Sequence, residues 1–215
     1  MADEISGIVE KPAFWDEASA HLMRRDRILK RLIPRHTTEW MQPRPTPFIA
    51  LARAVVGQQV SVKSADAIWR RFAEKCDHHP TPSKVLALSE DDLRAAGLSK
   101  RKTEYIHHLA VHFAEKKVHP ELWAEMDDDA IVAELCAIRG VGRWTAEMFL
   151  IFSLQRPDVL PLDDLGLIKA ISLHYFSGEP VSRFEAREVA QAWAPWRTVA
   201  TWYLWRSLDS AAVRY

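Results

Sequence analysis

The sequence predicts an all-α protein, and three observations carry that prediction. Apolar residues recur at helical spacing over most of the chain, and the alternation typical of strands is scarce. Residues that start or stop helices separate the periodic segments, as Ser89 and Gly97 do. The 215 residues are 48% hydrophobic and 27% charged, which is ordinary for a folded protein and unlike a disordered one.

About ten helices of ordinary length fit a chain of this size. Prolines 34, 43, 45 and 47 mark an extended connector after the first helical segment. The expected helical segments are residues 14–33, 48–76 with an interruption near Gly57 or Ser61, 78–88, 89–97, 99–117, 127–138, the second half of 135–150, 164–176 and 182–208.

The composition limits what the protein can do. Basic and acidic residues number 29 each, so any nucleic acid must be bound by a local basic face. Cys76 and Cys136 are too few for an iron–sulfur cluster and suit a reducing compartment. The acidic N-terminus does not have the pattern of a signal peptide, and no apolar run has membrane-spanning length. We expect a monomer in the cytoplasm, associated with the nucleoid, or in the nucleus of a eukaryote.

Residues 135–150, LCAIRGVGRWTAEMFL, predict two helices joined by a tight hairpin. Gly140 supplies the left-handed residue that ends the first helix, and Gly142 starts the second. Val141 is expected to fill the space between the two helices. The first amides of the second helix point outward at the positive end of its dipole and suit a phosphate. Flanking Arg139 and Arg143 add positive charge, although a plain helical corner would also explain the glycines.

Residues 160–167, LPLDDLGL, place two carboxylates at a proline turn just before a helix. Asp163 or Asp164 can cap this helix, which is the usual task of aspartate at such a position. Two adjacent aspartates are more than a cap requires, so one of them is also a candidate for chemistry.

Taken together, these motifs resemble the helix–hairpin–helix–GPD superfamily of base-excision DNA glycosylases. Four further segments resemble its AlkA-type branch, the 3-methyladenine DNA glycosylases II: FWDEASAHLMRRD, VVGQQVSVKSADAIW, AGLSKRKTEYI and WAPWRTVATWYLW. The resemblance covers most of residues 14–208. It implies one glycosylase unit over residues 1–215 with two helical lobes and an active-site cleft between them. Residues 1–45 and 165–215 would form one lobe, and residues 46–164 the other.

The resemblance also assigns roles to single residues. Asp164 matches the catalytic aspartate, and Asp163 is then a second acidic residue or the cap. Trp144 stands where strand-cutting relatives carry a lysine, which implies base removal without strand cleavage because an indole cannot form a Schiff base. The expected base pocket comprises Trp144, Met148, Leu165 and Trp205.

Other positions are expected to contact DNA. Gln59 falls at the position of the residue that wedges into the gap left by the extruded nucleotide, where relatives often have leucine. Met148 and Leu165 replace tyrosines that can stand in the pocket, so the preferred lesion is left open. The expected backbone contacts are Gly140, Gly142, Arg143, Thr145, Ser61, Lys63 and Lys102. Ser99–Lys102 is another possible phosphate contact, and the basic run 24–31 is interpreted as a solvated helix face.

No cofactor is expected, apart from an optional sodium or potassium ion on the hairpin carbonyls of Cys136, Ile138 and Val141, as in relatives. Glu104, His108 and His112 share one helix face with His107 beside it, and we do not favour a zinc site there because no fourth ligand is evident.

The expected activity is monofunctional removal of alkylated purines from double-stranded DNA. The alternatives are a glycosylase of this fold for etheno-adenine or hypoxanthine, and a non-catalytic protein that binds damaged DNA.

Overall fold

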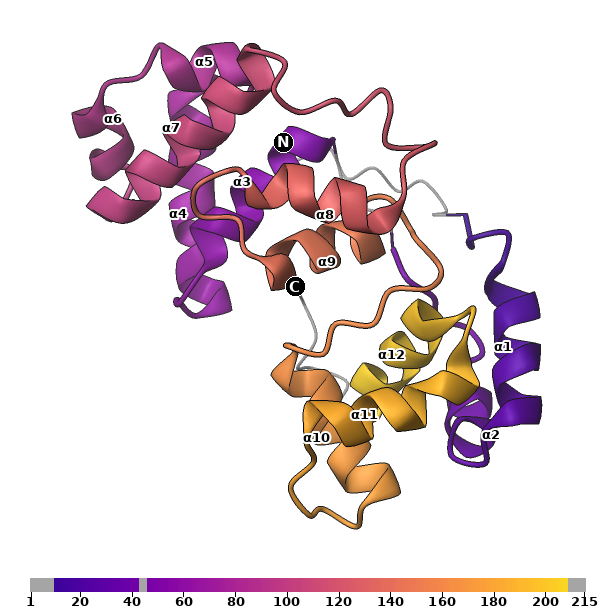
Figure 1. Cartoon of the computed structure of the whole chain (residues 1–215). Coiled ribbons are helices and arrows are strands. Elements are labelled where there is room, and N and C mark those ends of the chain that lie inside the picture. Colours follow the sequence, from indigo (N-terminus) through magenta and orange to yellow (C-terminus); the bar gives the residue numbers. More distant parts are fainter. Residues whose placement is uncertain (1–9, 43–45, 209–215) are drawn as a thin grey trace. The chain divides into compact units, whose positions relative to one another are not determined.

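The computed structural model describes residues 10–42 and 46–208, and every regular element in these ranges is a helix (Figure 1). The prediction of an all-α fold is confirmed. Twelve α-helices and two short 3-10 helices are present in the described ranges, slightly more than expected. None of the described helices is long and apolar enough to cross a membrane.

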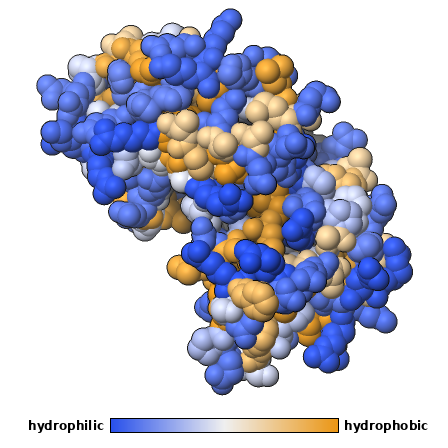
Figure 2. Space-filling view, viewed as in Figure 1, coloured by the Kyte–Doolittle hydropathy of each residue, from blue (hydrophilic) through white to orange (hydrophobic). Residues whose placement is uncertain are grey.

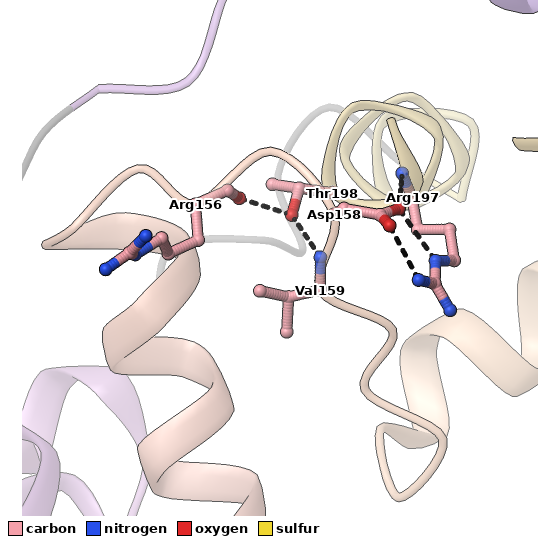
Figure 3. Close-up of polar contacts among 5 residues, drawn as sticks. All are labelled: Arg156, Asp158, Val159, Arg197 and Thr198. Atoms are coloured by element: carbon pink, nitrogen blue, oxygen red, sulfur yellow. Dashed lines mark hydrogen bonds and ion pairs between the residues drawn. The ribbon is translucent and has the colours of Figure 1, made fainter. Parts of the chain in front are cut away.

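The described residues divide into two compact units. One unit comprises residues 10–42 and 155–208, and the other comprises residues 46–154. Residues 155–164 therefore belong with the C-terminal helices, although the expected lobe boundary grouped them with residues 46–154. The reason is a set of hydrogen bonds between residues 156–159 and two residues at the start of α12, Arg197 and Thr198 (Figure 3).

The first unit is built around α12, which packs against α1, α2 and α10. All side chains from Thr198 to Trp205 are buried, so this helix is the core of the unit. The elements are α1 (Trp15–Arg25), α2 (Leu29–Leu32), η1 (Ile33–Arg35), α10 (Leu165–Tyr175), α11 (Arg183–Ala190), η2 (Gln191–Trp193) and α12 (Arg197–Arg206).

The single helix predicted over residues 14–33 is wrong, because Asp26 divides it. Asp26 has an extended backbone, and its carboxylate accepts the amides of Ile28 and Leu29 at 2.7 and 3.0 Å. The other carboxylate oxygen accepts bonds from Tyr175 and Trp193. A local cap and two distant partners thus outweigh the helical periodicity at this point.

The second unit contains the hairpin. Its elements are α3 (Pro47–Gly57), α4 (Val62–Lys75), α5 (Pro82–Leu86), α6 (Glu90–Ala95), α7 (Lys100–Ala114), α8 (Asp128–Cys136) and α9 (Arg143–Phe152). The predicted interruption near Gly57 or Ser61 is confirmed as the turn between α3 and α4. Helix α3 packs against α4, α7 and α9, and α8 packs against α9.

Each unit contains one helix that is buried all round over most of its length, α12 in the first unit and α9 in the second. Helix α9 is buried from Thr145 to Ile151. Figure 2 shows that hydrophilic residues cover most of the visible surface, with smaller hydrophobic patches. Several large hydrophobic side chains are exposed, and Leu165, at 84% exposure, is the most accessible of the described ones.

Candidate active site and DNA-binding hairpin

The predicted hairpin joins α8 to α9, and its two glycines have different structural reasons. Gly140 has a φ of 96°, which is the left-handed conformation expected of a helix stop. A Cβ at this position would lie 2.3 Å from Cγ of Tyr105. Gly142 starts α9 with an ordinary φ of −95°, and a Cβ there would meet no described atom within 4 Å.

Three side chains of the same unit hold the hairpin in place. The ring of Tyr105 packs on Gly140. Gln58 donates from Nε2 to the Gly140 carbonyl at 2.9 Å. His108 accepts the Arg139 amide at Nδ1, at 3.0 Å, which requires the neutral imidazole at that nitrogen. Burial, together with His112 and Arg139, lowers the pKa of His108 and favours this neutral form.

A hollow of about 360 Å³ lies beside the hairpin. It is lined by the turn after α3, the start of α7 and the hairpin backbone. Four residues predicted to contact DNA line it together: Gln59, Lys102, Gly140 and Gly142. The structure thus brings these residues, which are distant in sequence, to one concave surface.

Gln59 lies in the turn between α3 and α4, where it is exposed and has a φ of 55°. This left-handed conformation is uncommon for a residue other than glycine and points to a local constraint. Its neighbour Gln58 is tied to Gly140, so the tip that carries Gln59 is attached to the hairpin. Val60 and Val62 beside it are also exposed. The exposure of Gln59 is compatible with a wedge, and this role stays a prediction.

Two of the predicted cationic contacts are already engaged within the protein. Arg143 donates from Nε to Glu147 at 2.9 Å and contacts Asp129 at 3.4 Å, and Glu147 is the main cause of its raised pKa. Lys102 donates from Nζ to the Val56 carbonyl at 2.8 Å, and burial lowers its pKa. To contact a DNA phosphate, each side chain must either use its remaining N–H donors or break the hydrogen bonds to these partners.

The other predicted backbone contacts lie at helix starts. Ser61 caps α4 by accepting the Ser64 amide at 3.2 Å, and Lys63 is exposed in the first turn of that helix. Ser99 caps α7 in the same way. Thr145 is buried in the first turn of α9, so only its backbone could contribute to a phosphate site there. These contacts stay predictions.

Asp164 occupies the start of α10 in the other unit, and it is 2% exposed. Its Oδ1 accepts two hydrogen bonds, from the Leu167 amide at 2.7 Å and from Trp205 Nε1 at 2.8 Å. Two N–H donors and the positive end of a helix dipole together stabilise an anionic carboxylate. The candidate catalytic aspartate is therefore rigidly held and in direct contact with a candidate pocket aromatic.

Asp164 is also the helix cap, so the suggestion that Asp163 takes this task is wrong. Asp163 instead forms an ion pair with Arg183 at 2.6 Å, and its side chain is 38% exposed. The pair shows that the two adjacent carboxylates have separate partners. Of these two adjacent residues, Asp164 is the one that is buried and accepts hydrogen bonds from both a backbone amide and an aromatic side chain.

The four predicted pocket residues differ in their surroundings. Trp205 is buried at 1% exposure, and its indole nitrogen is bonded to Asp164. Trp144 is half-buried and Met148 is buried, and their spacing of four places them on one face of α9. Leu165 follows Asp164 and is highly exposed. Their joint role as a pocket stays a prediction.

The residues weighed as a zinc site have other partners. Glu104 pairs with Arg139 at 3.1 Å, and His112 bonds through Nδ1 to the His108 carbonyl at 2.9 Å. Among residues 10–42 and 46–208, no three His, Cys, Asp or Glu side chains are grouped to hold a metal.

Sequence reasoning missed the residues that support the site. Gln58, Tyr105 and His108 hold the hairpin, and Asp158 and Arg197 hold the segment before Asp164. The doubled glutamine of GQQVS was the only visible signal for Gln58. The charge pair is separated by 39 residues and has no local signature.

Both the sequence and the fold are similar to those of known proteins. The family model described as HhH-GPD superfamily base excision DNA repair protein matches residues 52–195. DNA-3-methyladenine glycosylase 1 of Schizosaccharomyces pombe is 33% identical over 198 residues, covering 89% of this chain and 86% of the relative.

Two solved structures are similar over most of the chain. A DNA-3-methyladenine glycosidase from Bacillus halodurans has a TM-score of 0.83 at 33% identity, and the match covers 90% of this chain and 89% of the other. The S. pombe 3-methyladenine DNA glycosylase in complex with abasic DNA has a TM-score of 0.77 at 31% identity, with coverage of 92% and 100%. The chain belongs to the HhH-GPD superfamily of base excision DNA repair proteins.

Proposed function

We propose that this chain is a monofunctional DNA glycosylase that removes alkylated purines, of the 3-methyladenine and 7-methylguanine type, and leaves an abasic site. Membership of a base-excision repair family and relatives named as 3-methyladenine DNA glycosylases support excision of alkylated bases. A similar structure in complex with abasic DNA supports DNA as the partner. Double-stranded DNA with an alkylated base, bound by a monomer, is the proposed substrate complex.

The observation that carries the proposal is the setting of Asp164. The carboxylate is buried, lies at a helix N-terminus and is fixed by the Leu167 amide and the Trp205 indole. A carboxylate held in this way needs little reorganisation when positive charge develops beside it. Such a group suits a reaction that passes through a cation.

The reaction follows from the chemistry of the substrate. Alkylation at N3 or N7 gives the purine a positive charge, so it leaves with the electron pair of the C1′–N bond without strong acid catalysis. The sugar becomes an oxocarbenium ion, which the Asp164 carboxylate stabilises. Water then adds to C1′ and releases a proton, which completes hydrolysis. One carboxylate is sufficient, in contrast with glycosidases that also require a general acid.

Recognition of the base follows from its charge. The nucleotide must first leave the helical stack, at a cost of a few kcal/mol. A cationic purine is attracted to electron-rich aromatic faces, with about 0.5–2 kcal/mol for each contact. The half-buried indole of Trp144 offers such a face, and Met148, which is buried, lies one turn further along α9.

The absence of strand cleavage is part of the proposal. The second helix of the hairpin carries Trp144 where strand-cutting relatives carry lysine, and an indole has no amine to attack the sugar. A single experiment separates the two outcomes. Monofunctional action leaves an alkali-labile strand, whereas lyase activity would cut it without treatment.

DNA would be gripped by the hairpin. The outward amides at the start of α9 suit one phosphate. Gly142 has no side chain and has open space beside its α-carbon, so a phosphate can approach the backbone closely there. Carbonyl oxygens of Cys136, Ile138 and Val141 are a donor set that suits a sodium or potassium ion. The Ile138 carbonyl already accepts the Val141 amide at 3.0 Å, which leaves one lone pair for an ion.

The test is the identity of the bases that the protein releases. Mass spectrometry of the supernatant from methylated DNA should detect 3-methyladenine or 7-methylguanine with the wild type. Asp164→Asn keeps an oxygen for the helix cap but removes the charge, so release should fall at least a hundredfold while affinity for abasic DNA changes little. Full activity of Asp164→Asn would contradict the assignment of the catalytic residue.

A further comparison resolves the substrate range. Duplexes that carry etheno-adenine or hypoxanthine test the alternative preference, because these bases are neutral and lack the cationic attraction. The protein should release them far more slowly than 7-methylguanine. Binding of abasic DNA without release of any base would support the non-catalytic alternative.

A further inference from the structure

Helix α12 begins without a cap from its own sequence. Trp196, at the cap position, provides no side-chain hydrogen bond to the helix amides within the described residues. Instead the Arg197 amide donates to Oδ1 of Asp158 at 3.1 Å, and the Thr198 amide donates to the Pro157 carbonyl at 3.0 Å. The segment that leads from α9 to Asp164 therefore caps α12 from 39 residues away.

The side chains strengthen this attachment (Figure 3). Arg197 donates from Nε to Oδ1 of Asp158 at 2.7 Å and from Nη2 to Oδ2 at 2.6 Å. This is the two-pronged geometry that gives arginine–carboxylate pairs their directional specificity. The hydrogen bond to Asp158 is the main cause of the raised pKa of Arg197. Because the two side chains are 36% and 28% exposed, the pair fixes geometry more than it adds energy.

Thr198 joins the segment at a second point. Its hydroxyl accepts the Val159 amide at 2.9 Å and donates to the Arg156 carbonyl at 2.6 Å. Thr198 is fully buried, and its bond to the Val159 amide is shielded from water. Arg156 takes part through its backbone only, and its side chain extends away from the contact (Figure 3). We call these five residues the clasp: Arg156, Asp158, Val159, Arg197 and Thr198.

The far end of α12 holds the other end of the same segment. Trp205, eight residues after Arg197, donates from its indole to Asp164 at 2.8 Å. Eight residues of helix span about 12 Å. Within the segment, turns join Leu162 to Leu160 and Asp164 to Pro161. One helix thus holds the segment at residues 156–159 and again at Asp164.

We propose that the clasp is a positioning device for the reaction, and that the Asp158–Arg197 pair sets where the Asp164 carboxylate lies against Trp205. The inference rests on the proposed function of Asp164 and adds residues that do not touch the substrate. The turns over residues 160–164 connect residues 156–159 to Asp164, so a displacement of residues 156–159 also displaces Asp164. A shift of the carboxylate by a fraction of an ångström weakens its interaction with the developing sugar cation.

Two variants remove the two-pronged pair with little change elsewhere. Asp158→Asn keeps an oxygen that can accept the Arg197 amide but loses the charged pair. Arg197→Lys keeps the positive charge but loses the planar fork. The matched control is Tyr175→Phe, which removes a partly buried 2.7 Å hydrogen bond to Asp26 in the same unit without touching the clasp. It removes one hydrogen bond to a carboxylate of this unit and none of those that hold the segment before Asp164.

The first readout is the single-turnover rate of base release at saturating protein, below the melting temperature of every variant. Both clasp variants should release 7-methylguanine about tenfold more slowly, with affinity for abasic DNA within about twofold of the wild type. Tyr175→Phe should keep the rate within about twofold. If the clasp variants keep the wild-type rate, or if Tyr175→Phe slows the reaction equally, the proposal is wrong.

The second readout does not depend on activity. The indole N–H resonance of Trp205, assigned by its loss in Trp205→Phe, reports the hydrogen bond to Asp164. It should shift in Asp158→Asn and Arg197→Lys and stay in place in Tyr175→Phe. An unchanged resonance in both clasp variants would overturn the proposal. If the wild type releases no base, the proposed function fails by itself, while the resonance still decides whether the clasp positions Asp164.

Discussion

The two hairpin glycines allow the fold and the DNA contact to be tested separately. Gly140 needs its hydrogen for two reasons, a φ of 96° and the ring of Tyr105 against its α-carbon. Gly142 has an ordinary φ and open space where a Cβ would stand. Alanine at the first position should therefore damage the structure, whereas alanine at the second should leave the structure intact.

The magnitudes follow from these geometries. A left-handed alanine costs about 1–2 kcal/mol, and relief of a contact of 2.3 Å with the Tyr105 ring adds the cost of overpacking, about 1–3 kcal/mol. Gly140→Ala should thus lower the free energy of unfolding by about 2–5 kcal/mol. Gly142→Ala reduces the conformational freedom of the unfolded chain, which stabilises the folded protein by about 0.4–1 kcal/mol. This gain offsets the cost of alanine at the N-cap of α9, where it is less favourable than glycine. The net change should stay within about 1 kcal/mol.

Urea unfolding and fluorescence anisotropy with abasic DNA, at one fixed salt concentration, measure the two effects. Gly142→Ala should bind about tenfold more weakly despite a near-normal unfolding curve, because its methyl group obstructs the close approach of a phosphate to the first amides of α9. Normal DNA affinity of this variant would refute the phosphate site. Equal destabilisation by the two substitutions would refute the structural distinction between the glycines.

Three further predictions concern single side chains. Trp205→Phe removes the indole donor to Asp164, so the free energy of unfolding should fall by about 1.5–3 kcal/mol and the single-turnover rate of base release should fall at least tenfold. An unchanged rate would show that this hydrogen bond is not needed for the reaction. The pKa of His108 lies below its usual 6.5, so its contribution to stability is complete above pH 6.5 and declines as the pH falls toward the pKa of His108 in the folded protein. Urea unfolding at a series of pH values and an NMR titration of His108 measure this effect, and a His108 pKa above 6.5 would contradict it. Thr201 is fully buried, and its hydroxyl has no hydrogen-bond partner among the described residues. Thr201→Val should therefore raise the free energy of unfolding, measured in urea, by about 1 kcal/mol. A loss of stability would contradict this and show that the hydroxyl has a partner.

Local signals explain what could be predicted from the sequence. The left-handed stop at Gly140 and the turn near Ser61 depend on residues close in the chain, and both were predicted. The cap at the start of α10 was also expected from the paired aspartates, but the sequence did not tell which of them takes it. Adjacent carboxylates look alike until Trp205 and Arg183 give them different partners.

Distant partners explain what could not be predicted. Asp26 breaks the first helix with support from Tyr175 and Trp193, which are 149 and 167 residues away. Gln58 reaches Gly140 across 82 residues. Each of these side chains is polar and unremarkable in its local sequence, and its role arises only when the fold supplies a complementary donor or acceptor.

Each unit fixes its own part of the function by internal contacts, and this has a consequence for how mutations act. Gln58 and His108 orient the hairpin, so their loss should appear as weaker DNA binding. Trp205 and Arg197 orient the carboxylate of Asp164, so their loss should appear as a slower chemical step at unchanged affinity. The hydrogen bonds named for each set join residues of a single unit, so we expect combined substitutions from the two units to have additive effects in free energy. Strong non-additivity of Gln58→Ala and Arg197→Lys in the single-turnover rate would show instead that hairpin and carboxylate are coupled.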